Sequence, residues 1–268
     1  MIRNSDYKLI AVDLDGTLLN SNKEVSEVNR KAMLDIQHRG IKVAIASGRP
    51  PIGCKAAAEN IGLSENNGYV IGYNGGEIIE YSSKRCIFDK SLPTETIKDI
   101  WTYAETNGFT LLIHDDVIIT NNKDNQYVQL SSVRNRMEIL EIHEYGDQLC
   151  SRRLHKCMIA DEPSVIKNIA GCTAEMFPTI NVFQSEPHFL EFVPKGIDKG
   201  EALRMLAQHI NISMEDVIAF GDALNDIPML SVAGTGVAMG NAPDKLKELA
   251  DIIAPANDED GVAWVING

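Results

Sequence analysis

The chain has 268 residues, and 44% of them are hydrophobic, which is enough for a sizeable core in one or two domains. Its 25 basic and 38 acidic residues give a formal net charge of −13. Because binding to nucleic acid or to an anionic membrane needs clustered cations, the sequence predicts neither as a partner.

The first part of the chain alternates between strands and helices. The expected strands are 9–12, 41–46 and 69–72, and the expected helices are 27–39 and 52–60. Ser26 is placed to cap the first helix, and Gly40 is placed to end it. Strands separated by helices are typical of a parallel, doubly wound sheet.

The pattern changes between residues 84 and 187. Short apolar runs typical of strands lie at 86–88, 110–113, 117–120, 157–159 and 181–183, with helical segments near 96–106 and 164–170. The first pattern then returns, with a helix at 199–209 and strands at 217–220, 236–239 and 252–254. We therefore predict an α/β fold: a doubly wound, Rossmann-like parallel sheet in 1–83 and 188–268, interrupted by an α/β domain in 84–187.

Polar residues follow several of these strands directly. Asp13 and Asp15 come after the first strand, Ser47 and Gly48 after the second, and the segment Gly221-Asp222-Ala223-Leu224-Asn225-Asp226 closes a later one. Because the carboxyl ends of parallel strands share one edge of a sheet, we expect these groups to lie close together.

These residue types suit the transfer of a phosphoryl group. Two carboxylates one residue apart repel each other unless a cation shares their site, and oxygen ligands suit Mg²⁺. Lys199 lies in the first turn of a helix, where the helix dipole disfavours a cation, so a nearby anion is expected. A carboxylate can attack a phosphate only when cations neutralise the charge, and an Asp nucleophile then forms an aspartyl phosphate.

Four segments in this order resemble the motifs of the haloacid dehalogenase (HAD) superfamily. They are Asp13-Leu14-Asp15-Gly16-Thr17, Ala46-Ser47-Gly48-Arg49, Lys199-Gly200 and the segment 221–226. The position of the insertion resembles that of a type C2 cap. Asn74-Gly75-Gly76 and Phe189-Leu190-Glu191-Phe192-Val193-Pro194 are similar to the Cof-type, subfamily IIB branch, so the resemblance implies that 84–187 is a C2B-type cap.

The resemblance also implies a role for each motif position. Asp13 would be the nucleophile and a metal ligand. Asp15 would be the general acid and base, with its backbone carbonyl on the metal. Ser47 and Lys199 would hold phosphoryl oxygens. Asp222 would complete the metal site, with Asn225 and Asp226 placing metal-bound water or phosphate.

Four further residues are candidates for substrate contact, each with a structural alternative. Asn74 and Gly75 are typical of a β-turn, and their backbone is also expected to meet substrate. Arg49 is expected mainly to support its loop or to form an ion pair, with phosphate contact as the alternative. His188 is expected either to pack at a hinge or to contact substrate, and Ser47 could instead cap a helix.

Together these features predict a Mg²⁺-dependent phosphatase that hydrolyses phosphomonoesters of small metabolites, with sugar phosphates favoured. Two alternatives remain open: a sugar phosphomutase of the same superfamily, and a non-catalytic regulator that is phosphorylated on aspartate. We expect a monomer or a weak homodimer.

The sequence also favours a cytoplasmic location. Its apolar runs fall short of the roughly 20 residues that span a membrane, and residues 1–6 contain no signal-peptide core. The five cysteines are odd in number and widely spaced, which indicates buried, reduced thiols.

Overall fold

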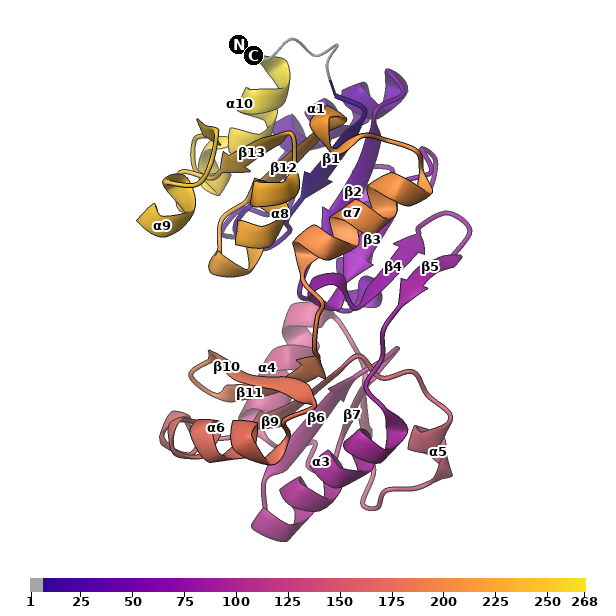
Figure 1. The fold of residues 1–268 in the computed structure, drawn as a ribbon, viewed down its shortest axis with the longest axis vertical. Helices are drawn as coiled ribbons and strands as arrows, with labels where there is room; N and C mark the ends of the chain where they lie inside the picture. Colours follow the sequence, from indigo (N-terminus) through magenta and orange to yellow (C-terminus); the bar gives the residue numbers. More distant parts are fainter. Residues whose placement is uncertain (1–6) are drawn as a thin grey trace. The chain divides into compact units, whose positions relative to one another are not determined.

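The computed structural model describes residues 7–268 as two compact units (Figure 1). The core unit runs to Asp89 and resumes with Ile197–Gly268, and the inserted unit is Lys90–Gly196. The sequence predicts these boundaries at 83/84 and 187/188. They differ because strand 86–89 pairs with the core sheet and strand 189–194 pairs with the inserted one. Residues 1–6, where no signal peptide is predicted, lie outside the described part of the chain.

The core unit is built around an eight-stranded sheet with the order β14-β13-β12-β1-β2-β3-β4-β5. The six strands from β14 to β3 are parallel, while β4 and β5 run antiparallel at one edge. The strands are β1 (Leu9–Val12), β2 (Lys42–Ala46), β3 (Tyr69–Gly72), β4 (Glu77–Glu80), β5 (Cys86–Asp89), β12 (Val217–Gly221), β13 (Thr235–Ala238) and β14 (Ile252–Ile253). The predicted parallel sheet is thus confirmed, and the hairpin at its edge is an addition to it.

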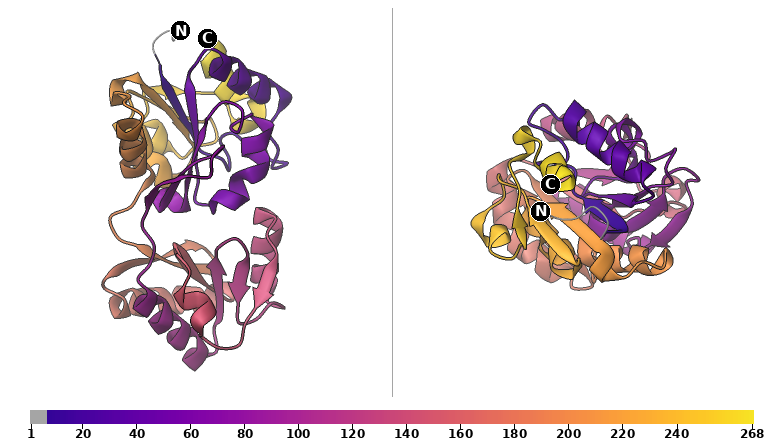
Figure 2. Two further views of the ribbon diagram at one scale, coloured as in Figure 1. Left: turned by 90° about the vertical axis from the view of Figure 1, so that its right-hand side faces the viewer. Right: turned by 90° about the horizontal axis from the view of Figure 1, so that it is seen from above.

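Helices cover both faces of this sheet. They are α1 (Glu27–His38), α2 (Lys55–Asn60), α7 (Lys199–His209), α8 (Ile227–Val232), α9 (Asp244–Lys247) and α10 (Gly261–Asn267). Short 3₁₀ turns are η1 (Pro51–Cys54), η2 (Tyr73–Gly75), η3 (Met214–Asp216), η4 (Leu224–Asp226) and η5 (Asn257–Glu259). Figure 2 (left) shows helices on both sides of this sheet. Apolar side chains of α1, α2 and α10 pack on one face, and those of α7, α8 and α9 pack on the other.

Local sequence signals explain where two of these helices begin. The Ser26 side chain accepts a hydrogen bond from the Asn29 backbone N–H at the start of α1, as predicted. The Asp198 side chain does the same for the Glu201 N–H at the start of α7. This cap makes Lys199 the first residue of α7, and its side chain is fully buried.

The inserted unit has its own six-stranded sheet with the order β10-β11-β9-β6-β7-β8. All its neighbouring strands are antiparallel except β7 and β8. Its elements are α3 (Thr94–Asn107), β6 (Thr110–His114), β7 (Ile118–Thr120), α4 (Gln126–Asn135), β8 (Ile139–Glu141), α5 (Asp147–Cys150), β9 (Lys156–Ala160), α6 (Pro163–Met176), β10 (Ile180–Glu186) and β11 (Phe189–Pro194). The predicted second α/β domain therefore has a sheet separate from that of the core.

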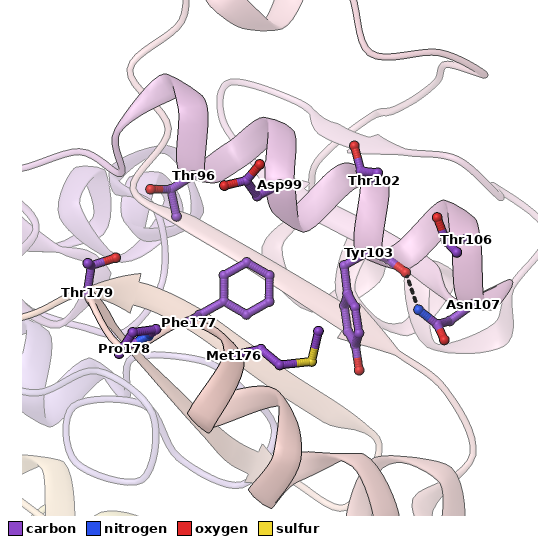
Figure 3. Close-up of a pocket in the computed structure, with 10 residues that line it drawn as sticks. All are labelled: Thr96, Asp99, Thr102, Tyr103, Thr106, Asn107, Met176, Phe177, Pro178 and Thr179. Atoms are coloured by element: carbon purple, nitrogen blue, oxygen red, sulfur yellow. Dashed lines mark hydrogen bonds between the residues drawn. The ribbon is translucent and has the colours of Figure 1, made fainter.

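The two faces of the inserted sheet are covered by different helices. Apolar residues of α3 and α6 pack on one face, and Val128 of α4 packs on the other. A pocket of about 690 Å³ lies between α3 and the end of α6, with the rings of Tyr103 and Phe177 in its wall (Figure 3). The Tyr103 hydroxyl lies 2.9 Å from Thr173 Oγ1, so this polar group already has a partner.

All five cysteines are free thiols, in agreement with the prediction. Cys54 and Cys157 are buried, but the prediction of burial is wrong for Cys86, Cys150 and Cys172, which are exposed. Residue spacing alone does not show which side of an element faces solvent. No helix within residues 7–268 has both the length and the apolar character needed to cross a membrane.

Candidate active site

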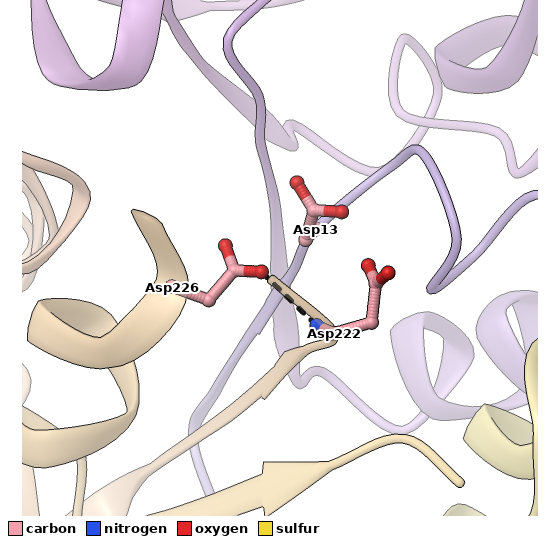
Figure 4. A group of neighbouring side chains, drawn as sticks. All are labelled: Asp13, Asp222 and Asp226. Carbon is pink, nitrogen blue, oxygen red and sulfur yellow. Dashed lines mark hydrogen bonds between the residues drawn. The ribbon is translucent and has the colours of Figure 1, made fainter. Parts of the chain in front are cut away.

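Three carboxylates meet at the carboxyl edge of the core sheet. Asp13 follows β1, Asp222 follows β12, and Asp226 ends the turn η4 (Figure 4). One carboxylate oxygen from each residue lies within 4.8 Å of those of the other two. Asp13 and Asp226 are buried, and Asp222 is half-buried. The pairing of β1 with β12 in the parallel sheet brings these distant parts of the sequence together.

One lysine lies among these acids. Lys199 Nζ is 2.5 Å from Asp13 Oδ1 and 2.6 Å from Asp226 Oδ1, and the lysine side chain is fully buried. The second oxygen of Asp226 accepts hydrogen bonds from the backbone N–H groups of Asp222 and Ala223. The turn η4 is therefore fixed around Asp226, and the anion expected next to Lys199 is present.

The charges of this cluster do not balance. Burial raises the pKa of Asp13 to about 8; Lys199 opposes the rise, and the neighbouring Asp226 and Asp222 add to it. Burial also raises the pKa of Asp222. Three carboxylates and one ammonium group carry a net charge of −2 when all are ionised, so a divalent cation would neutralise the site.

Asp15 lies in a different electrostatic environment. Its carboxylate accepts two hydrogen bonds of 2.6 Å from the Arg49 guanidinium and one of 3.0 Å from Lys23 Nζ. Burial acts to raise the pKa of Asp15, but Arg49 and then Lys23 outweigh it, so the pKa is lowered. In this structure Asp15 is thus held as a carboxylate by a cationic clamp, and Arg49 forms the ion pair expected of it.

The turn after Asp15 packs against Asp222. Gly16 has φ +87°, and a Cβ there would lie 2.3 Å from Asp222 Oδ2. The position therefore requires glycine for two reasons, its left-handed backbone and its close approach to the carboxylate. Thr17 Oγ1 donates a 2.8 Å hydrogen bond to Asp222 Oδ1, a contact that the motif alone does not predict.

The loops after β2 and β3 form a second polar group at the same edge. Ser47 is buried, and its backbone carbonyl accepts from the N–H of Asn74. Asn225 Nδ2 donates a 3.0 Å hydrogen bond to Asn74 Oδ1, which joins η4 to η2. Gly48 packs close to the Asn74 amide, and Gly75 approaches the Asp198 carbonyl so closely that a Cβ would lie 2.5 Å from it.

His188 is the one predicted site residue in the inserted unit. Its ring stacks on Tyr127 with centroids 4.5 Å apart and meets Phe189 edge-on at 4.4 Å. Its Nε2 lies 3.4 Å from Glu186 Oε2. These contacts explain His188 by packing, and its predicted contact with substrate stays a prediction.

The sequence prediction missed three polar residues at this edge: Lys23, Thr17 and Asn241. Asn241 follows the end of β13, so the strand-end rule that located the other residues could have found it. Thr17 lies in the first motif segment, but the resemblance implies no role for it, and Lys23 lies outside the motifs. The contacts of both residues depend on how the loop after β1 folds back on itself.

The comparisons with known proteins show the family of this chain. A statistical model of the haloacid dehalogenase-like hydrolases matches residues 10–266. The chain belongs to this family. A solved haloacid dehalogenase-like hydrolase from Bacteroides thetaiotaomicron is 41% identical, with a TM-score of 0.94, over 97% of this chain and 98% of that one.

Two relatives that match this chain over nearly their whole length are named as phosphatases. One is 5-amino-6-(5-phospho-D-ribitylamino)uracil phosphatase YcsE of Bacillus subtilis, 34% identical over 97% of this chain and 95% of that protein. Another is phosphatase YwpJ of the same organism, 31% identical over 97% of this chain and 98% of that protein. The predicted family, α/β fold class and phosphatase activity are confirmed.

Proposed function

We propose that this HAD phosphatase uses Mg²⁺ and the carboxylate of Asp13 to hydrolyse small phosphomonoesters. The observation that carries the proposal is the fully buried Lys199 between Asp13 and Asp226, with Asp222 beside them. A lysine that only stabilised the fold would need one carboxylate, whereas this cluster has three and an uncompensated negative charge.

The donor set fits a hard divalent cation. Asp13 offers buried carboxylate oxygens and Asp222 half-buried ones, and the net charge of −2 balances that of the ion. We propose that Asp13, Asp222 and the backbone carbonyl of Asp15 hold Mg²⁺, with Asp226 beside it. When bound, the ion would neutralise charge on the phosphoryl group and on Asp13.

The first chemical step is assigned to Asp13. One carboxylate oxygen attacks phosphorus, the bond from phosphorus to the leaving oxygen breaks, and an aspartyl phosphate forms. Lys199 supplies a fixed positive charge for the phosphoryl oxygens, because neighbouring Asp13 and Asp226 outweigh burial and raise its pKa. Ser47 is the proposed hydroxyl donor to the same oxygens.

Asp15 is assigned the proton transfers. It gives a proton to the leaving oxygen in the first step. In the second step it takes a proton from the water that attacks phosphorus, and the bond from phosphorus to the Asp13 oxygen breaks, which releases inorganic phosphate and restores the Asp13 carboxylate. Its lowered pKa in the Arg49 clamp suits the second role. For the first role the Asp15 carboxyl must separate from Arg49 and bind a proton, so we propose that the pair opens during each turnover.

The substrate class is proposed from chemistry and from a relative. The name of the YcsE phosphatase describes a phosphate on a ribityl chain, which is a polyhydroxylated alcohol. We propose that this chain also acts on phosphomonoesters of polyhydroxylated metabolites, with sugar phosphates foremost. A monomer or weak homodimer in the cytoplasm is the accompanying proposal.

A panel of phosphorylated metabolites tests this function. The enzyme with Mg²⁺ is expected to release inorganic phosphate, with kcat/KM highest for sugar or sugar-alcohol phosphates, and chelation is expected to abolish turnover. Isomerised sugar phosphate without free phosphate would indicate the mutase instead. An aspartyl phosphate that persists for minutes without turnover would indicate the regulator.

A further inference from the structure

Asn241 joins the two segments that the proposed metal site draws on. Its Nδ2 donates a 2.8 Å hydrogen bond to the Gly16 carbonyl and lies 3.3 Å from Asp222 Oδ2. Its Oδ1 accepts a 3.1 Å hydrogen bond from the Asn257 backbone N–H. One side chain thus contacts the turn after β1, the acid after β12 and the turn η5.

These partners also fix the orientation of the Asn241 amide. Nδ2 faces a carbonyl oxygen and a carboxylate oxygen, which only accept, and Oδ1 faces an N–H group, which only donates. A flipped amide would place its oxygen against two acceptors. The contacts of Asn241 therefore suit asparagine specifically, because they need two donors and one acceptor on a short side chain.

Asp222 is held from both sides as a result. Thr17 donates to its Oδ1 and Asn241 to its Oδ2, while each oxygen keeps a further lone pair. Asn257, which donates its backbone N–H to Asn241, also makes a buried hydrogen bond: its Nδ2 donates to the Leu19 carbonyl at 2.9 Å. Asn241 is thus anchored to the loop that carries Asp13 and Asp15.

From this geometry we propose that Asn241 is a positioning residue of the metal site. It orients the Asp222 carboxylate and holds the Gly16 carbonyl, one peptide after that of Asp15, so that the carbonyl of Asp15 and the oxygens of Asp222 are ready for one cation. The inference rests on the proposed function, because it needs the cation to bind at Asp13 and Asp222. Mutation of a residue that is hydrogen-bonded to a metal ligand typically lowers metal affinity by about 10- to 100-fold.

The test is direct titration of the metal-free protein with Mg²⁺ by calorimetry, without substrate. Asn241→Ala and Asn241→Ser are each expected to raise the Mg²⁺ dissociation constant by about tenfold or more. Asn66→Ala is the matched control, because Asn66 Nδ2 also donates a 2.8 Å hydrogen bond to a backbone carbonyl, that of Gly62, away from the acids. Its Mg²⁺ affinity is expected to equal that of the wild type.

Thermal melting in chelator separates positioning from folding. The Asn241 variants are expected to lower the metal-free melting temperature somewhat more than Asn66→Ala, because they lose more hydrogen bonds, while only the Asn241 variants lose Mg²⁺ affinity. Dissociation constants within twofold of wild type for both Asn241 variants would overturn the inference alone. A wild-type protein that binds no Mg²⁺ would overturn the proposed metal dependence and this inference with it.

Discussion

Replacement of Asp13 by asparagine is expected to stabilise the metal-free protein while it abolishes catalysis. The folded protein raises the pKa of Asp13 from its ordinary value of 3.8 to about 8. Between these values the folded state binds a proton that the unfolded state has lost, so the free energy of unfolding falls as pH rises from about 4 to about 8. Asparagine has no proton to lose, and Lys199 keeps Asp226 as its partner.

The size of this effect follows from the same pKa. One pKa unit corresponds to about 1.4 kcal/mol, so the penalty for ionising Asp13 is at most ~6 kcal/mol. In the variant Lys199 keeps its contact with Asp226. We therefore expect the free energy of unfolding of metal-free Asp13→Asn to exceed that of the wild type by at least ~1 kcal/mol between pH 5 and pH 8.

Urea unfolding in chelator at several pH values measures this difference. Mg²⁺ should reduce the stability difference between the two proteins at pH 8. Bound metal stabilises the wild-type site by mass action, whereas Asp13→Asn has lost an anionic ligand. Parallel pH profiles for the two metal-free proteins would refute the reasoning, since they would mean that Asp13 is not under electrostatic stress in the folded state.

Two other replacements test the cations of the site. Lys199→Met leaves two buried carboxylates without their cation, so unfolding in chelator is expected to show a loss of about 3–5 kcal/mol. Lys8→Met, which removes an exposed pair with Asp216, should change stability far less, and equal losses would contradict the assignment. Arg49→Met is expected to raise the pKa of Asp15 towards its ordinary value and so to move the acidic limb of the kcat–pH profile to higher pH. An unmoved limb would show that Arg49 does not control Asp15.

Much of the core could be predicted because its signals are local. Apolar runs such as 9–12 and 217–220 have the length of buried strands, and parallel strands end at one edge of their sheet, which is enough to bring Asp13 and Asp222 together. Lys199, 186 residues away in the sequence, reaches Asp13 by another route: it is the first residue of α7, which packs on a face of this sheet.

The boundaries and the finer contacts depend on tertiary pairing. Segment 86–89 could pair with either sheet, and only its register with β4 assigns it to the core. Segment 189–194 pairs with β9 of the inserted sheet, although the sequence pattern assigns it to the core. Lys23 carries no motif of its own, and its role appears only when the loop after β1 folds around Asp15. Asn241 could be located by its place after β13, but its contact with Asp222 depends on how the neighbouring loops fold.

The central claim is that Asp13 becomes covalently phosphorylated during turnover. The most direct measurement is acid quenching of the enzyme with Mg²⁺ and its best phosphomonoester, followed by mass spectrometry of its peptides. The account predicts an acyl phosphate on Asp13 in the wild type, more of it in Asp15→Asn because hydrolysis is slowed, and none in Asp13→Asn. Phosphate release by a wild type that shows no such adduct at any quench time, or an adduct on another residue, would contradict it.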